Sequence, residues 1–245
     1  MKLRAPTVDL TSLTVRFKTF RRTKLYDFFA AALIIAWFVF CAAQMLPSLS
    51  QQIALAKLVI QTDPSVLPAG LVLSTISHST TLIFLAVLVV MFAVRHVPQR
   101  TLPGFYPRCA ALAATFLGVS IVLLPPRELS SALYIASLLL IISGTIFALC
   151  AVIVLGRSIS IVPEARRFVT RGPYALVRHP IYLGETVAMI GVALQYLSAW
   201  ALLLLGLQFA FQLQRMKYEE RLLSQVFPEY ESYMTRTARL VPGVY

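Results

Sequence analysis

Two stretches of the 245-residue chain carry the residue types that do chemistry, and the first covers 157–185. It reads RSISIVPEARRFVTRGPYALVRHPIYLGE, which is cationic and rich in turn formers yet lies between two apolar runs. The Gly-Pro and His-Pro pairs each predict a turn, because a residue before proline is kept out of helical geometry. Pro180 then suits the first turn of a helix. We expect free backbone N–H groups beside His179 and Tyr182, at the positive end of that helix dipole, where an anionic group would bind.

The side chains of this stretch allow two interpretations. His179 can hydrogen-bond a polar group of a ligand, and Tyr174 and Tyr182 can pack on a flat ring. The alternative is a solvated loop whose aromatic residues mark a membrane interface.

The second stretch reads QLQRMKYEERLLSQVFPEYESYMTR and begins at Gln212. Arg215 and Glu219 are four residues apart, so they lie on one face of a helix and can form an ion pair. On a solvated helix such a pair contributes only a few tenths of a kcal/mol. Here the apolar run ends at this point, and ionisable residues at that depth of a membrane are costly without partners and indicate a functional site.

The elements that must position these residues are transmembrane helices. The chain is 58% hydrophobic and only 13% charged, with a mean hydropathy of +0.78, which is too apolar for a soluble domain. We predict an all-α, polytopic bundle of about six spans, since a bilayer core needs about 20 apolar residues. The spans are expected at 27–47, 69–94, 108–125, 130–155, 182–197 and 199–213. The last two form a helical hairpin, and the final helix continues into the polar C-terminal segment.

The cations indicate the orientation of these spans. The net charge of +12 comes from clusters between apolar runs, which is typical of cytoplasmic loops and argues against a nucleic-acid partner. Both termini and the loops near 95–108 and 157–178 are therefore expected in the cytoplasm. We divide the chain into a basic cytoplasmic arm (1–26), four spans (27–155), and a segment with the loop, the hairpin and a cytoplasmic C-terminal helix (156–245). The three cysteines have no metal-ligand spacing, so no metal site is predicted.

Three motifs together resemble one superfamily. RGPYALVRHPIYLGE, a hydrophobic hairpin, and then RMKYEERLL and FPEYESYM are similar to the isoprenylcysteine carboxyl methyltransferases and phosphatidylethanolamine methyltransferases, over about residues 155–244. The resemblance implies S-adenosylmethionine as cofactor, bound at the cytoplasmic face, and a lipophilic or prenylated acceptor that enters from the membrane lipid. It implies Arg215 and Glu219 as the catalytic pair. The cofactor contacts that it implies are Tyr174, Val177, Arg178, His179, Pro180, Tyr182, Gly184, Glu185, Glu220 and Tyr230.

The acceptor remains open at this point. For a carboxylate, Arg215 would hold it bidentately while Glu219 fixes the guanidinium; for an amine, Glu219 would be the general base. We expect O-methylation of an isoprenylcysteine-like carboxylate, with phospholipid N-methylation as the alternative. An NADPH-dependent sterol or isoprenoid reductase is a candidate from another class, and a transporter is a further one. The membrane would be the inner membrane in a bacterium and the endoplasmic reticulum in a eukaryote. The sequence leaves the oligomeric state open.

Overall fold

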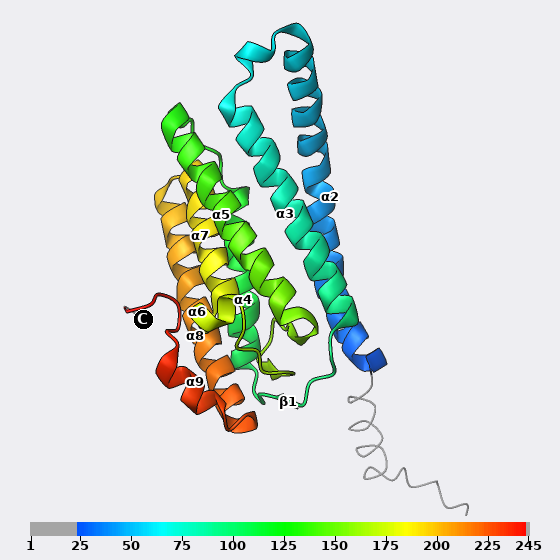
Figure 1. The fold of residues 1–245 in the computed structure, drawn as a ribbon, viewed down its shortest axis with the longest axis vertical. Helices are drawn as coiled ribbons and strands as arrows, with labels where there is room; N and C mark the ends of the chain where they lie inside the picture. The colour runs from blue at the N-terminus through cyan, green and yellow to red at the C-terminus, as the bar shows by residue number, and fades with distance from the viewer. Residues whose placement is uncertain (1–23, 244–245) are drawn as a thin grey trace, which may run out of the picture.

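The computed structural model describes residues 24–243, and these are mostly helical (Figure 1). The basic arm expected over 1–26 lies outside the described residues, apart from those that begin the first helix. The α-helices are α2 (Lys24–Thr62), α3 (Ala69–Val94), α4 (Tyr106–Ser120), α5 (Ser131–Leu155), α6 (Pro173–Leu176), α7 (Pro180–Gln195), α8 (Ala199–Val226) and α9 (Tyr230–Arg236). Short 3-10 helices are η1 (Pro64–Val66), η2 (Ile121–Leu123) and η3 (Gly156–Ser158), and two-residue strands are β1 (Arg100–Thr101) and β2 (Glu164–Ala165).

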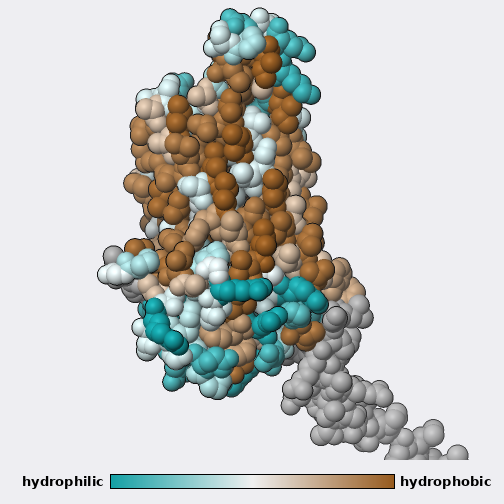
Figure 2. All heavy atoms as spheres, viewed as in Figure 1, coloured by the Kyte–Doolittle hydropathy of each residue, from teal (hydrophilic) through white to brown (hydrophobic). Residues whose placement is uncertain are grey.

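Four of these helices are long and apolar enough to cross a membrane. They cover Asp27–Thr62, Ala69–Val94, Tyr106–Leu123 and Ser131–Ser158. Figure 2 shows the matching surface, an apolar belt over most of the height of the molecule with a larger group of hydrophilic residues at its lower end and a smaller one at its upper tip. The fifth and sixth predicted spans form the helical hairpin α7–α8, but α7 has only 16 residues and the second half of α8 is polar. The chain is thus an integral membrane protein with four helices of clear spanning length.

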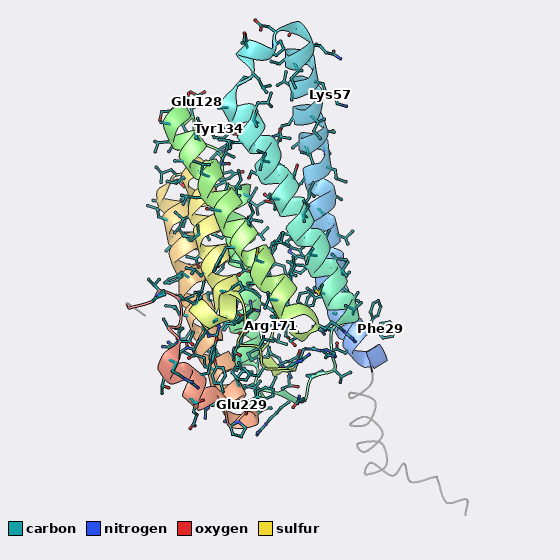
Figure 3. The ribbon with its side chains drawn as sticks, in the orientation of Figure 1. Phe29, Lys57, Glu128, Tyr134, Arg171 and Glu229 are labelled. Carbon is teal, nitrogen blue, oxygen red and sulfur yellow. The ribbon has the colours of Figure 1, made fainter. Side chains whose placement is uncertain are left out.

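Helix α2 differs from its predicted bounds. A span was expected to end at residue 47, but the helix continues through Pro47 to Thr62, for 39 residues. One proline inside a helix removes one backbone hydrogen bond, whereas the following residues are mostly good helix formers such as Gln, Ala, Leu and Lys. At 1.5 Å per residue the helix is about 58 Å long, about twice a bilayer core. Its distal end, near Lys57, extends beyond the other helices (Figures 1 and 3).

Helices α5 and α7 are packed backbone to backbone through glycines. A Cβ atom added at Gly144 of α5 would lie 2.5 Å from the Gly184 carbonyl oxygen, and one added at Gly184 would lie 2.6 Å from the Gly144 carbonyl oxygen. Gly191 faces Ser137 in the same way, at 2.6 Å. Small residues allow helices in membranes to approach this closely. The contact fixes α7, and with it the loop that precedes α7, against the longest apolar helix of the C-terminal half.

The loops expected to be basic gather at one end of the bundle. The β1 strand pairs with β2, so the segment after α3 is hydrogen-bonded to the segment after α5. Figure 3 shows Arg171 and Glu229 at this end and Lys57 and Glu128 at the other. The polar segments that carry the predicted site therefore share one face of the bundle.

Candidate active site

A cavity of about 390 Å³ connects the polar end of the bundle with its apolar interior. Its apolar wall comes from helices α2 to α5 and includes Phe38, Phe84, Leu88, Phe92, Gly118 and Ile141. Its polar wall comes from helices α7 and α8 and from the segment before α7, residues 159–179, which we call the pre-helix loop. The polar wall includes Tyr174, Arg178, His179, Tyr182, Glu185, Gln212, Arg215 and Glu219. One space thus faces both the predicted chemistry and a lipid-like environment.

The predicted ion pair forms, and it includes a third residue. Arg215 Nε donates to Glu219 Oε1 at 3.2 Å, and the Tyr182 hydroxyl donates to the same oxygen at 2.5 Å. The Arg215 guanidinium also lies over the Tyr182 ring, 4.8 Å from its centroid. Arg215 is only 7% exposed, so these contacts are largely shielded from water.

A chain of polar contacts behind Arg215 was not anticipated. Arg215 Nη2 donates to the Ser160 carbonyl oxygen at 2.9 Å, and the Ser160 hydroxyl donates to Glu164 at 2.7 Å. Glu164 accepts from Arg166 at 2.6 Å, and Arg166 also pairs with Asp27 of α2 at 2.8 Å. Within residues 24–243, Arg215 Nη1 has no protein acceptor, so both of its N–H groups can donate to a ligand, as can the second N–H of Nη2.

Glu185 lies on the cavity wall with an amide beside it. Gln212 Nε2 donates to the Glu185 carboxylate at 3.2 Å, while Gln212 Oε1 lies 3.0 Å from the Thr186 hydroxyl. In the described part of the chain, no cationic nitrogen lies within 4.0 Å of Glu185. Glu185 and Glu219 thus place two carboxyl groups near the Arg215 guanidinium, while Arg166, Arg167 and Arg178 also line the cavity.

His179 connects the cavity to an ion cluster around Glu220. Its ring stacks on Tyr182 with 5.4 Å between centroids, and its Nε2 lies 3.2 Å from Glu220. Glu220 also pairs with Arg178 at 3.0 Å and with Arg239 at 2.5 Å. Burial opposes ionisation of Glu220, but the hydrogen bonds from His179 and Arg239 and the charge of Arg178 outweigh it and lower its pKa to about 2.

The expectation of free N–H groups beside His179 was wrong for His179 itself. Its N–H donates to the Arg239 carbonyl oxygen at 3.1 Å, and the N–H of Arg178 donates to the Ala238 carbonyl oxygen at 2.8 Å. The C-terminal segment runs back along the pre-helix loop, and its carbonyl oxygens accept the hydrogen bonds from these two N–H groups. An anion site made of backbone N–H groups at these two positions is therefore excluded.

Of the remaining predicted residues, some line the cavity and others pack behind it. Tyr174 and Arg178 line the cavity, whereas Val177 and Pro180 are buried beside it without lining it. Gly184 lies in the α5–α7 contact. Tyr230 is 2% exposed and packs edge-on against Phe168, 5.4 Å away between centroids, and burial raises its pKa.

Sequence reasoning also missed two glutamines on the cavity wall of α8. Gln208, Gln212, Arg215 and Glu219 recur at intervals of four, three and four residues, which places them on one helical face. Gln208 is 4% exposed, and its Oε1 is buried without a hydrogen-bond partner among the residues that the structure describes. The available signal was two amides at this spacing inside an apolar run.

Comparison with known proteins gives a family for this part of the chain. The family model described as phospholipid methyltransferase matches residues 132–230. The chain is therefore similar to that family over about two fifths of its length. This match confirms the resemblance noted in the sequence and covers α5, the pre-helix loop, the hairpin and the whole cavity-facing stretch of α8.

Individual relatives carry two kinds of name, an isoprenylcysteine methyltransferase and a metal-resistance protein. The chain is 33% identical over 114 residues to protein-S-isoprenylcysteine O-methyltransferase A of Arabidopsis thaliana, which covers 44% of this chain and 58% of that protein. It is 32% identical over 116 residues to the nickel-cobalt-cadmium resistance protein NccN of Alcaligenes xylosoxydans xylosoxydans, covering 46% of this chain and 52% of the relative. The chain thus spans about half the length of the curated relatives that it matches.

Proposed function

We propose that the protein is an S-adenosylmethionine-dependent methyltransferase that acts on a lipophilic acceptor, most simply the carboxylate of an isoprenylcysteine-like molecule. The observation that carries the proposal is the single cavity in which the Arg215–Glu219 pair faces the apolar space between the helices. A lipophilic acceptor can occupy the apolar part while its reactive group lies at the polar end. The family match and the isoprenylcysteine methyltransferase relatives support the reaction class.

The residues present fit such a cofactor. S-adenosylmethionine supplies a methyl group on a positively charged sulfonium, and this charge is lost as the methyl group is transferred. Glu185 and Glu219 supply carboxyl groups on the cavity wall that can attract a cation. Tyr174 and Tyr182 add aromatic surface on the same wall, where cation–π contact and ring packing are favourable. His179 would contribute a hydrogen bond from the side of the ion cluster.

The other residues that the family resemblance implies as cofactor contacts would support the shape of the site without touching the cofactor. Gly184 lets α7 approach α5, and Glu220 holds the pre-helix loop to α8 through Arg178 and His179. Val177, Pro180 and Tyr230 fill the space behind the loop. Their substitution would alter the cofactor site through its shape.

In this reaction the protein would align the acceptor with the methyl group and exclude water from the cavity. Arg215 would bind a carboxylate acceptor through Nη1 and Nη2, while Glu219, Tyr182 and the Ser160 carbonyl keep its guanidinium in place. Arg215 Nε and one N–H of Nη2 have protein acceptors, which leaves both N–H groups of Nη1 and the second N–H of Nη2 for the bidentate contact expected from the sequence.

A second candidate acceptor is the amine of a phospholipid headgroup. The carboxyl groups of Glu185 and Glu219 can attract an ammonium group as well as a sulfonium. Glu219 would then remove the proton that the amine must lose before it attacks. The family description, phospholipid methyltransferase, supports this alternative.

The proposed arrangement in the membrane has six crossings, with α7 and α8 as the fifth and sixth. The polar end that carries Arg171 and Glu229 would face the cytoplasm, because basic loops are retained there (Figure 3). The helices that follow the hairpin would lie at that surface, over the polar end of the cavity.

The test is methyl transfer from radiolabelled S-adenosylmethionine by the detergent-purified protein, with N-acetyl-S-farnesylcysteine and dioleoyl phosphatidylethanolamine as acceptors. We expect one acceptor to be methylated, and Arg215→Ala and Glu219→Ala each to abolish turnover while S-adenosylhomocysteine still binds. Full activity in both variants would show that the proposed catalytic pair is wrong.

A further inference from the structure

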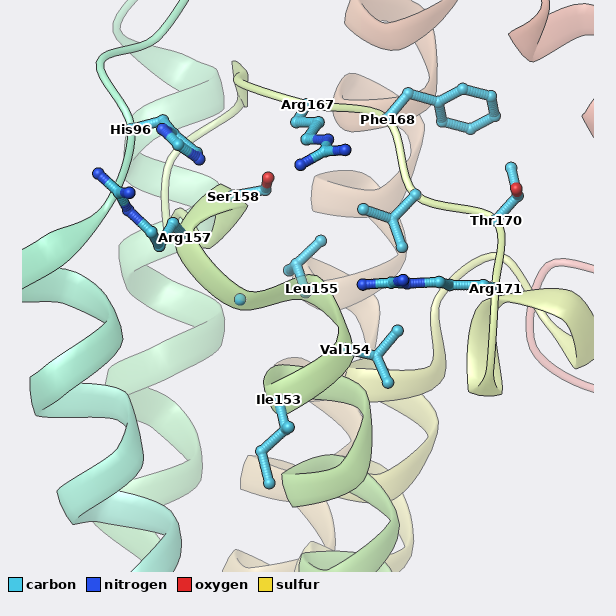
Figure 4. Close-up of a pocket in the computed structure, with 12 residues that line it drawn as sticks. His96, Ile153, Val154, Leu155, Arg157, Ser158, Arg167, Phe168, Thr170 and Arg171 are labelled. Carbon is cyan, nitrogen blue, oxygen red and sulfur yellow. The ribbon is translucent and has the colours of Figure 1, made fainter.

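A second cavity, of about 430 Å³, lies at the end of α5 next to the first (Figure 4). It is lined by residues 153–158, by residues 167–171 and by His96. Leu155, Ser158 and Arg167 line both cavities, so the two share a wall. The methyl-transfer proposal uses none of the arginines of this second cavity.

Three arginines give this cavity an uncompensated positive charge. Arg157, Arg167 and Arg171 line it, and no Asp or Glu does. Among residues 24–243, no carboxylate lies within 4.0 Å of any of these three guanidinium groups, whereas the adjacent Arg166 pairs with both Asp27 and Glu164. Arg157 Nε donates to the Val94 carbonyl oxygen at 2.7 Å, which leaves its other nitrogens for a ligand. The cavity is therefore built to attract an anion.

The other side of the cavity is apolar and belongs to a spanning helix. Ile153 and Val154 line it, and Ile153 is 56% exposed on a helix whose spanning segment is Ser131–Ser158. The helix changes from apolar to basic residues at Leu155, which places the cavity at the boundary between lipid and water. A ligand that fits both sides is an amphiphile with a negatively charged head.

The loop that carries two of the arginines is anchored. Phe168 stacks on Phe227 with 5.9 Å between centroids, and Gly172, with a φ of +60°, lets the chain turn directly over Val154. Figure 4 shows Arg167 and Arg171 extending from this loop toward the end of α5. Their guanidinium groups thus project from a fixed frame into the same space.

We propose that this cavity binds the phosphate headgroup of an anionic phospholipid, with its acyl chain along the Ile153 side of α5. The planar guanidinium of arginine matches phosphate oxygens, and anionic lipids concentrate at the basic face of a membrane. This proposal does not depend on methyl transfer, since it rests on a second cavity, of whose arginines only Arg167 also lines the Arg215 cavity.

The test measures lipid-dependent thermal stabilisation of the full chain in detergent, with added dioleoyl phosphatidylglycerol, dioleoyl phosphatidylcholine or inorganic phosphate. We expect stabilisation by phosphatidylglycerol alone, and an apparent affinity at least about tenfold weaker in the double variant Arg167→Gln/Arg171→Gln. The matched control is Arg221→Gln/Arg236→Gln, which removes two exposed arginines that do not line the cavity.

Three other results would overturn the proposed lipid site. Equal weakening in both double variants would show only a general attraction between a basic protein and anionic lipid, and would overturn the site. Equal stabilisation by inorganic phosphate would assign the cavity to a soluble phosphate ligand. A wild-type protein that phosphatidylglycerol does not stabilise would refute the proposal outright. Because none of the four substituted side chains is buried, the lipid-free melting temperatures of both double variants should match that of the wild type.

Discussion

Glu220→Gln should destabilise the protein by about 3 kcal/mol at neutral pH. The pKa of Glu220 is lowered from its ordinary 4.5 to about 2, and each unit corresponds to about 1.4 kcal/mol of preference for the charged carboxylate in the folded state. The glutamine keeps the shape but removes the charge that Arg178, His179 and Arg239 surround. For a chain of this size, such a loss lowers the melting temperature by on the order of 10 °C.

The same reasoning fixes the pH dependence of this contribution. A lowered pKa means that the stabilisation is complete above pH 4.5 and is lost as the pH falls from 4.5 toward 2. Unfolding in mixed detergent micelles at pH 7 and pH 4 measures it, with Glu231→Gln as the control because Glu231 is exposed on α9. If Glu220→Gln and Glu231→Gln unfold alike at neutral pH, the ion cluster does not stabilise the fold and the reasoning is refuted.

The remaining predictions concern the cofactor, the helix contact and the topology. His179→Ala should weaken S-adenosylhomocysteine binding by about 1–2 kcal/mol, the value of one hydrogen bond, in calorimetry; an unchanged affinity would leave His179 a structural residue. Gly184→Val should prevent accumulation of folded protein, because its Cβ would lie 2.6 Å from the Gly144 carbonyl oxygen, whereas Gly206→Val meets open space and should express normally; equal yields would contradict the close packing. A cysteine at Asp63 should react with an impermeant reagent on intact cells and one at Thr101 should not, and the reverse pattern would invert the proposed topology.

Local spacing was enough to predict much of the fold and the central pair. Helix α3 covers 69–94, as the apolar run indicated, and the hairpin breaks next to residue 198. Arg215 and Glu219 pair because a separation of four residues fixes their proximity on any helix. These features depend on residues that are near one another in sequence.

The features that were missed depend on distant residues. Asp27 and Arg166 are 139 residues apart, so their contact follows only from the packing of α2 against the loop after α5. The N–H of His179 donates to the carbonyl oxygen of Arg239, 60 positions further along the chain. No local sequence pattern indicates that the C-terminal segment packs there. The extension of α2 was missed because proline and polar residues normally indicate a helix end, although a long helix can accommodate one proline.

Calorimetric titration of the detergent-purified protein with S-adenosylmethionine, and separately with NADPH, tests the central claim most directly. We predict micromolar binding of S-adenosylmethionine that weakens in Glu185→Gln, because the cavity wall then loses a carboxyl group that can attract the sulfonium, and no binding of NADPH. Binding of NADPH without S-adenosylmethionine would contradict the proposed methyltransferase activity and favour a reductase.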